Sequence, residues 1–236
     1  METIAFIPAR SGSSRLKNKN ILLINKKPLI FWTLKTAIEL NIFDNIIFSS
    51  DSKRYYDLLI KSLKKSNLST KKITFDLRST EQAGQKKKIF DYIKYDLIKK
   101  FKFSKKDLIV QMLPTSPLRT KNTVKLVIDL SKKTKKNVFT VSKYDFHISF
   151  ALILKNNKWK ALFNNSPLKN GKTQSQDQKE FLRPNPVANC LWVKNIKKST
   201  KSIYEQALAF KTNSIESIDI DNKSDFLIVK SMMENG

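Results

Sequence analysis

The sequence predicts an α/β fold, in which a mostly parallel β-sheet is covered by helices on both faces. Over residues 1–142, short apolar runs alternate with stretches whose apolar residues recur at helical spacing. Such alternation is typical of parallel strands joined by helices. The length of 236 residues suits one domain, and the 40% hydrophobic fraction, with 15 Phe, provides a core.

The expected strands and helices alternate regularly up to residue 142. Each strand rests on a short apolar run that is compatible with a buried strand. The five strands are residues 4–8, 45–50, 72–75, 108–112 and 137–142. Each helix is predicted from apolar residues at helical spacing. Pro28 is expected to start the first helix, and Asp51 or Ser52 to cap the second. The four helices are residues 29–38, 52–63, 85–103 and 124–130.

After Ser142 the alternation stops, and the sequence predicts an inserted arm. Residues 151–154 and 159–162 indicate a hairpin, and polar, proline-containing residues follow as far as 187. We therefore expect one domain over residues 1–236, with an inserted β-rich arm at 143–187. The remaining predicted elements are a strand at 189–193, a helix near 202–208, an extended segment at 218–221 and a helix at 222–233.

The composition excludes several kinds of site. A single Cys, Cys190, excludes an internal disulfide and a multi-Cys zinc site, and a single His, His147, excludes a site built on several histidines. Four Gly are too few for a glycine-rich phosphate loop of the Walker or Rossmann kind. We interpret Cys190 and His147 as packing or surface residues.

The formal net charge of +26 has two interpretations. A basic protein can bind nucleic acid or an anionic membrane. However, 40 of the 46 basic residues are Lys and are scattered along the chain, whereas proteins that read nucleic acids rely on Arg. We therefore expect a solvated surface that attracts small anions, and neither nucleic acid nor a membrane as partner.

The start of the chain favours a cytoplasmic protein. The sequence opens directly on the first apolar run, at Ile4, without the basic leader and apolar block of a signal peptide. No apolar run approaches the ~20 residues that a membrane-spanning helix needs.

The loop after the first predicted strand predicts an anion site. It contains Arg10, Arg15 and Lys19, with Ser and Gly residues between them. Several cations on one tight loop repel each other unless an anion lies among them, and small residues let backbone N–H groups approach that anion. We expect a triphosphate here, and a solvated basic loop is the alternative.

Asp219 and Asp221 predict a metal site. Side chains at positions i and i+2 of an extended segment point to the same side, so both carboxylates face one place and need a cation. Without a His or Cys cluster, these hard oxygen ligands favour Mg²⁺. The alternative is a solvated pair in which Asp221 caps the last helix.

The segment Pro114–Arg119 follows the fourth predicted strand. Ligands of open parallel sheets bind at the carboxyl ends of the strands, so this segment is expected to line the same pocket as the basic loop. The alternative is a rigid turn in which Thr115 or Ser116 caps the next helix.

Four stretches of the sequence form a recognisable set: residues 4–20, Ser49–Asp51, Pro114–Thr120 and Ser217–Asp221. Together, and in this order, they resemble the CMP-sialic acid synthetases, or acylneuraminate cytidylyltransferases, including the pseudaminate and legionaminate types. The resemblance implies a Rossmann-like nucleotidyltransferase fold, Mg²⁺ as cofactor, and a homodimer joined by the arm. It also implies that CTP reacts with an acidic 2-keto sugar to give a CMP-sugar and pyrophosphate.

The resemblance further implies roles for individual residues. The residues implied to bind the nucleotide are Ala9, Arg10, Ser11, Ser14, Asn20 and Arg78. The catalytic residues are Arg15, Lys19, Asp219 and Asp221, of which the two aspartates hold the metal. The residues implied to bind the sugar are Thr115, Ser116 and Arg183, where Arg183 takes the sugar carboxylate.

The part of the sequence that matches the sugar site departs from the family pattern. Leu113 stands where relatives usually carry Gln, and Leu152 where they carry a sugar-contacting Lys. A sugar acid different from N-acetylneuraminate is therefore an equally good expectation, and a CMP-Kdo-type enzyme is the alternative activity. The sequence is also compatible with an inactive homologue or a basic RNA-binding protein, although the chain lacks an RNA-recognition motif and a continuous basic stripe.

Overall fold

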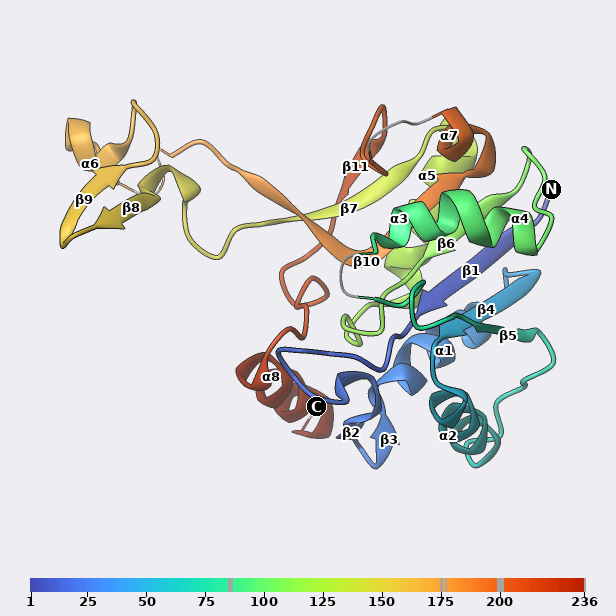
Figure 1. The fold of residues 1–236 in the computed structure, drawn as a ribbon. Coiled ribbons are helices and arrows are strands. Elements are labelled where there is room, and N and C mark those ends of the chain that lie inside the picture. The colour runs from blue at the N-terminus through green and yellow to red at the C-terminus, as the bar shows by residue number, and fades with distance from the viewer. Residues whose placement is uncertain (85–86, 175, 177, 199–201, 236) are drawn as a thin grey trace.

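The chain forms a seven-stranded sheet. The computed structural model describes residues 1–84, 87–174, 176, 178–198 and 202–235. The strands of the large sheet are β1 (Thr3–Pro8), β4 (Asn45–Ser50), β5 (Ile73–Leu77), β6 (Leu108–Gln111), β7 (Val138–Lys143), β10 (Leu182–Trp192) and β11 (Leu208–Lys211). Their order is β11-β7-β10-β6-β1-β4-β5 (Figure 1). Within the described part of this sheet, only β10 runs antiparallel to its neighbours, which confirms the predicted mostly parallel sheet.

Helices cover both faces of this sheet. The first face carries α1 (Leu29–Leu40), α2 (Lys53–Lys64) and α5 (Lys121–Thr134). The second carries α3 (Ile89–Asp91), the π-helical turn η2 (Tyr92–Leu97), α4 (Ile98–Lys100) and α7 (Val193–Lys198). Alternation along β1 supplies both cores, because Ala5 and Ile7 face the first set while Ile4 and Phe6 face the second. None of the described helices is long and apolar enough to cross a bilayer.

A third, smaller core joins the two ends of the chain. The last helix, α8 (Lys223–Asn235), lies against the hairpin of β2 (Leu23–Ile24) and β3 (Lys27–Pro28), which follows the short helix η1 (Lys19–Ile21). The buried side chains of this third core are Ile24, Leu29, Ile220 and Val229. Burial of Ile220 therefore holds the segment that carries Asp219 and Asp221 beside the amino-terminal loop.

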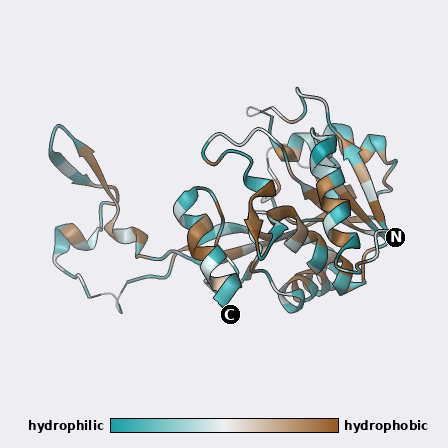
Figure 2. Cartoon of the chain, turned by 90° about the horizontal axis from the view of Figure 1, so that it is seen from below, coloured by the Kyte–Doolittle hydropathy of each residue, from teal (hydrophilic) through white to brown (hydrophobic). Residues whose placement is uncertain are grey.

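Between β7 and β10 the chain leaves the sheet and forms a projecting arm (Figure 1). The arm contains η3 (Ile148–Phe150), the hairpin strands β8 (Leu152–Lys155) and β9 (Lys158–Ala161), and α6 (Pro167–Asn170). The predicted hairpin is confirmed, and it turns at Asn156 and Asn157, which both have positive φ. Strand β8 is largely hydrophobic although it lies away from the cores (Figure 2).

The predicted helix near 202–208 is wrong. Residues 203–206 form turns, and Leu208 begins β11, which pairs in parallel with β7. Leu208 and Phe210 pack against the first core, so the open edge of β7 decides the conformation of this segment more than its local sequence does.

Several further predicted elements differ in their bounds. The strand expected at 189–193 begins earlier, at Leu182, and ends at Trp192. Of the helix expected at 85–103, positions 85 and 86 lie outside the described residues, and the helical part runs from Ile89 to Lys100 with a π-helical turn inside it. Helix α5 is capped by Thr120, whose side chain accepts from the Thr123 N–H, and not by Thr115 or Ser116.

Candidate active site

The loops that follow β1, β4, β5 and β6 lie along one edge of the sheet, because these strands are adjacent and parallel (Figure 1). This is the edge at which open α/β sheets bind ligands. The loops carry most of the residues predicted for the site. The segment before α8 brings Asp219 and Asp221 to the same edge through the backbone hydrogen bond from Ile220 N to Thr115 O (2.9 Å).

Two sets of hydrogen bonds fix the basic loop at both ends. At its start, the Ala9 N–H donates to Ser49 O (2.8 Å), and both the N–H and the hydroxyl of Ser11 donate to the Asp51 carboxylate (2.7 Å each). At its end, Asn20 Nδ2 donates to Arg10 O (2.9 Å). Partial burial opposes ionisation of Asp51, but the bonds from Ser11 prevail and lower its pKa.

The basic loop meets the acidic segment at Asp221. Arg15 contacts both carboxylate oxygens of Asp221, at 2.9 and 3.0 Å. Lys19 Nζ donates to Ile220 O (2.5 Å) and contacts Asp221 Oδ1 (3.3 Å). The two cations that were expected to bind phosphate are therefore neighbours, and they share one carboxylate.

Asp219 lies deeper than Asp221. Its Oδ1 is buried and has no hydrogen-bond partner among the described residues. Burial raises the pKa of Asp219, and the charge of Asp221 adds to this effect, whereas the Thr115 side chain and Lys19 oppose it. An unpartnered buried carboxylate oxygen is costly, so Asp219 is a candidate ligand for a cation that binds here.

The alternative in which Asp221 caps the last helix is wrong. The side chain of Asn222 accepts from the Asp225 N–H (3.0 Å), and Asp225 Oδ2 accepts from the N–H groups of Asp221 (2.8 Å) and Asn222 (3.0 Å). This reciprocal arrangement caps α8 and leaves the carboxylate of Asp221 available to Arg15 and Lys19.

Arg119 interacts electrostatically with Asp219 and supports the turn after β6. Only 4% of Arg119 is exposed, and it donates to the backbone oxygens of Ser116 (2.8 Å) and Leu113. Burial lowers the pKa of Arg119 to about 9, although the nearby carboxylates of Asp219 and Glu216 act in the opposite direction. The charge of Arg119 thus partly compensates these buried carboxylates.

Arg78 and Arg10 occupy another part of the same edge. Arg78 follows β5, is 5% exposed and donates from Nη2 to Ser49 O (3.3 Å). Burial lowers the pKa of Arg78, and the positive charge of Arg10 lowers it further, whereas Asp51 and Asp76 raise it. Of the two arginines predicted to contact the nucleotide, Arg10 therefore lies close enough for its charge to lower the pKa of Arg78.

Arg183 shares a cavity of about 350 Å³ with Asp219. In β10 it lies opposite Ser142 of β7. The remaining residues that line the cavity are Asp145, Ser214, Ile215, Ile218, Asp225 and Ile228. The cavity therefore combines one cationic group, three carboxylates and an isoleucine wall.

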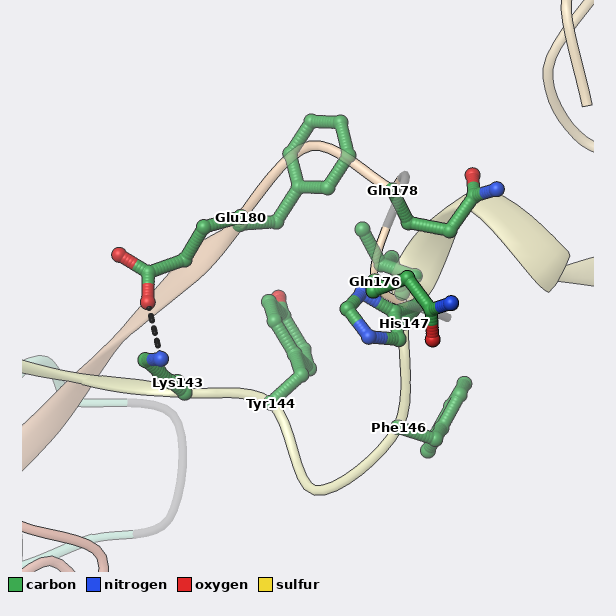
Figure 3. A pocket seen from close by; sticks show the side chains of 9 residues that line it. Lys143, Tyr144, Phe146, His147, Gln176, Gln178 and Glu180 are labelled. Carbon is green, nitrogen blue, oxygen red and sulfur yellow. Dashed lines mark ion pairs between the residues drawn. The ribbon is translucent and has the colours of Figure 1, made fainter. Parts of the chain in front are cut away.

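A second cavity, of about 380 Å³, lies at the root of the arm (Figure 3). His147, for which the sequence indicated no chemical role, lines it together with Tyr144 and Gln178. Lys143 and Glu180 form an ion pair (2.7 Å) beside it. The arm therefore leaves and rejoins the sheet next to a hollow of mixed polar and aromatic character.

The candidate residues thus fall into two neighbouring groups. Arg15, Lys19, Asp219 and Asp221 lie together, Thr115 lies against Asp219, and the Ser116 hydroxyl is buried without a partner among the described residues. A second group contains Ala9, Arg10, Ser11, Asn20 and Arg78. Arg183 joins the first group through the shared cavity, and Ser14 is exposed on the loop.

Sequence reasoning missed several residues that position this site. Asp51 belongs to a stretch that carried the family resemblance but received no role in the site, and Arg119 belongs to another. Their signal is an ionisable residue directly after, or close behind, a buried strand. Asp76 directly follows the strand predicted at 72–75 and so carries the same signal, but Glu216 does not. The partners of both come from segments distant in sequence.

Curated proteins of similar sequence point to one chemistry. The chain is 29% identical to the CMP-N,N'-diacetyllegionaminic acid synthase of Legionella pneumophila, over 99% of this chain and 97% of that protein. It is 27% identical to the pseudaminic acid cytidylyltransferase of Campylobacter jejuni, over 75% of this chain and 72% of that protein. A match at 34% identity to the N-acylneuraminate cytidylyltransferase of Escherichia coli covers 49% of this chain and 25% of that protein.

Solved structures share the fold. A CMP:2-keto-3-deoxy-manno-octonic acid synthetase complexed with CTP aligns over 100% of this chain and 99% of that chain, with a TM-score of 0.68 and 15% identity. A 4-diphosphocytidyl-2C-methyl-D-erythritol synthase aligns over 97% of both chains, with a TM-score of 0.66 and 10% identity.

The family match spans nearly the whole chain. The cytidylyltransferase family matches residues 4–227, a range that contains every candidate residue described above. The chain therefore belongs to the cytidylyltransferase family and is a nucleotidyltransferase enzyme.

Proposed function

We propose that the protein activates an acidic 2-keto sugar of the sialic-acid type with CTP, giving a CMP-sugar and pyrophosphate. The observation that carries this proposal is the contact of Arg15 and Lys19 with Asp221, two residues from the buried carboxylate of Asp219. This arrangement offers cations to a triphosphate and carboxylates to its metal in one place. The legionaminic and pseudaminic acid enzymes among the relatives support a nine-carbon sugar acid as acceptor.

The reaction is an in-line displacement at the α-phosphorus of CTP. A bond forms between the anomeric oxygen of the sugar and the α-phosphorus, and the bond to the β-phosphate oxygen breaks, so pyrophosphate leaves. Such transfer depends on positioning and on charge stabilisation. Arg15 and Lys19 exchange Asp221 for the phosphates and stabilise the leaving pyrophosphate, while Arg10 and Arg78 orient the nucleotide. The loop residues Ala9, Ser11, Ser14 and Asn20 shape the nucleotide pocket.

The cofactor in this proposal is Mg²⁺, held by Asp219 and Asp221. The unpartnered Oδ1 of Asp219 fits such a role. No group of three or more acidic, His or Cys side chains in the described part of the chain is placed to hold a metal, so the phosphates of CTP supply the remaining oxygens. When bound, the ion neutralises phosphate charge and lowers the pKa of the attacking hydroxyl.

The cavity that contains Arg183 is the proposed sugar site. Arg183 binds the sugar carboxylate through its planar donors. Thr115, whose side chain interacts with Asp219, and the adjacent Ser116 complete the set of residues proposed for the sugar. The isoleucine wall of Ile215, Ile218 and Ile228 suits acyl or deoxy substituents better than a fully hydroxylated sugar.

The proposed assembly is a cytoplasmic homodimer of one-domain chains, 1–236, joined by the arm at 143–187. On the hairpin, Leu152, Leu154 and Trp159 share one face and are 50%, 66% and 54% exposed in the single chain. Such an apolar surface, distant from the cores, is suited to contact a second copy of the chain. Nucleic acid and membranes are not partners in this proposal.

The test is a pyrophosphate-release assay with purified protein, CTP, Mg²⁺ and a panel of sugar acids that includes N-acetylneuraminate, legionaminate, pseudaminate and Kdo derivatives. We expect turnover with an acylated nine-carbon sugar acid, and a greater thermal stabilisation by CTP than by ATP, GTP or UTP. Turnover with Kdo alone would support the alternative enzyme. CTP binding without turnover on any sugar acid would indicate an inactive homologue. Salt-sensitive RNA binding in the absence of CTP binding would indicate an RNA-binding protein.

A further inference from the structure

A buried carboxylate next to Arg78 has no role in the proposed reaction. Asp76, in β5, has no exposed surface. It lies two residues before Arg78, at the edge of the sheet where the nucleotide is expected. Burying a carboxylate is costly unless donors surround it, so the donors of Asp76 indicate what its burial achieves.

Three donors from three separate elements converge on Asp76. Oδ2 accepts from the hydroxyl of Ser49, in β4, and from the hydroxyl of Tyr92, in η2, both at 2.6 Å. Oδ1 contacts Lys100 Nζ, at the end of α4, also at 2.6 Å. The carboxylate therefore fastens the helical segment 89–100 to the strand that ends at Arg78.

Tyr92 connects this cluster to Arg78. Its ring is 1% exposed, and the guanidinium carbon of Arg78 lies 5.5 Å from the ring centroid, a cation–π distance. The Phe6 ring also stacks on Tyr92, at 6.4 Å between centroids. Burial, and then the hydrogen bond to Asp76, raise the pKa of Tyr92, so its hydroxyl remains a donor.

Arg78 itself has few direct restraints. Its Nη2 donates to Ser49 O at 3.3 Å, and its Nε is buried without a partner in the described part of the chain. The orientation of the guanidinium therefore depends on the ring against which it lies. The π-helical turn places Tyr92 at that point, and such turns frequently occur at functional sites.

We propose that Tyr92, anchored by Asp76, is a positioning residue that orients Arg78 for binding of the cytidine nucleotide. This inference rests on the proposed function, and it assigns a role to a pair of residues that do not touch the substrate. The hydrogen bond to Asp76 fixes the position of the Tyr92 ring. The ring in turn orients the Arg78 guanidinium, which contacts the nucleotide. Lys100 and Ser49 are the remaining two partners of the Asp76 carboxylate.

The test starts with Tyr92→Phe, which keeps the ring and removes the hydroxyl that reaches Asp76. We expect the KM for CTP to rise about tenfold, the effect of one charge-assisted hydrogen bond, while kcat changes less than about twofold. The matched control is Ser131→Ala. The Ser131 hydroxyl is also buried with two hydrogen bonds, to Lys136 O and from Trp192 Nε1, but it lies toward the far end of α5.

A double-mutant cycle then separates positioning from folding. Because Tyr92 acts through Arg78, adding Tyr92→Phe to Arg78→Met is expected to leave the already raised KM for CTP unchanged. Additive effects on KM, or a Tyr92→Phe variant that loses melting temperature like Ser131→Ala but keeps the wild-type KM, would overturn the inference. Wild-type protein that neither binds CTP in a calorimetric titration nor releases pyrophosphate would overturn the proposed function, and the inference with it.

Discussion

Arg15 and Asp221 are 206 positions apart in the sequence, yet they form an ion pair through two contacts of 2.9 and 3.0 Å. A guanidinium that meets a carboxylate through two oxygens presents the same geometry that it offers to a phosphate. In the proposed function, the ion pair holds the loop in a form suited to phosphate before the nucleotide arrives. Binding of CTP would then exchange one oxygen anion for another.

Replacing Arg15 tests this exchange. The Arg15 side chain is 70% exposed, so Arg15→Ala is expected to change the free energy of unfolding by less than about 1 kcal/mol. The same variant is expected to lose most of the thermal stabilisation by CTP, because a phosphate-binding cation is missing. Melting curves with and without CTP measure both effects. Arg54→Ala, at an exposed position of α2, is the control, and a full CTP response in Arg15→Ala would contradict the assignment.

Replacing Asp219 tests the metal assignment. Asp219→Asn is expected to lower kcat at least about a hundredfold, because the loss of a metal ligand removes several kcal/mol of charge stabilisation from the transition state. The fold is expected to remain as stable as the wild type or more so, because burial raises the pKa of Asp219 and thus favours a neutral side chain. Pyrophosphate release and melting temperature are the two measurements. Near-normal turnover would refute the assignment.

The hydrogen bonds between Asp51 and Ser11 predict a pH dependence of stability. The pKa of Asp51 is lower in the folded state than its ordinary value of 3.8, so its ionised form stabilises the fold above that value. This contribution is lost as the pH falls through the lowered pKa. Wild-type protein is therefore expected to lose melting temperature more steeply than Asp51→Asn below about pH 4. Parallel slopes between pH 5 and pH 3 would show that Asp51 contributes nothing.

Arg119 predicts a large effect on folding. Arg119→Met leaves the carboxylates of Asp219 and Glu216 without their buried cation and several backbone oxygens without a donor. Removing one partner from a buried charged cluster costs about 3–5 kcal/mol. Urea denaturation is expected to show a loss of this size for Arg119→Met, and almost none for Arg54→Met, which removes an exposed guanidinium. Equal stabilities of the two variants would contradict the structural role.

The two faces of the arm hairpin provide a matched pair of variants. Leu154 and Trp159 pair on the apolar face, whereas Lys155 and Lys158 pair on the opposite face. Leu154→Glu is expected to convert the proposed dimer to a monomer, because it places a charge in an apolar contact. Lys158→Glu is expected to leave the dimer intact. Analytical ultracentrifugation measures the mass of each, and a wild-type monomer would refute the proposed assembly.

Much of the sheet was predictable from the sequence because its strands are buried on both sides. Runs such as Ile4–Pro8 and Leu108–Met112 are almost continuously apolar, so composition alone marks them. The segment 208–211 lies at the edge of the sheet, and only alternate residues of it pack inward. The helix predicted near 202–208 overlaps this strand only at Leu208, and the strand itself was not predicted, because it forms through pairing with β7.

The site was predictable where its residues stand close together in the sequence. The basic loop and the pair Asp219 and Asp221 show local charge patterns that need explanation without any structure. The cluster of Asp76 and Tyr92 was not predictable, because its members come from separate elements that meet only when the sheet and a helix pack together. A single Asp near a strand and a single Tyr in a helix do not indicate, from the sequence alone, that the two side chains will form a hydrogen bond.

Because β10 is antiparallel to β7, the arm between these two strands can be replaced without a change in the sheet. Because β10 runs against its neighbours, the chain departs after Lys143 and returns at Leu182, and these two residues are partners in the same ladder. The pairing of Lys143 with Leu182 brings the two ends of the arm together, so the residues between them can differ without a change in the strand order of the sheet. Grafting the corresponding segment from a relative onto these two anchor points would change the projecting arm while preserving the sheet.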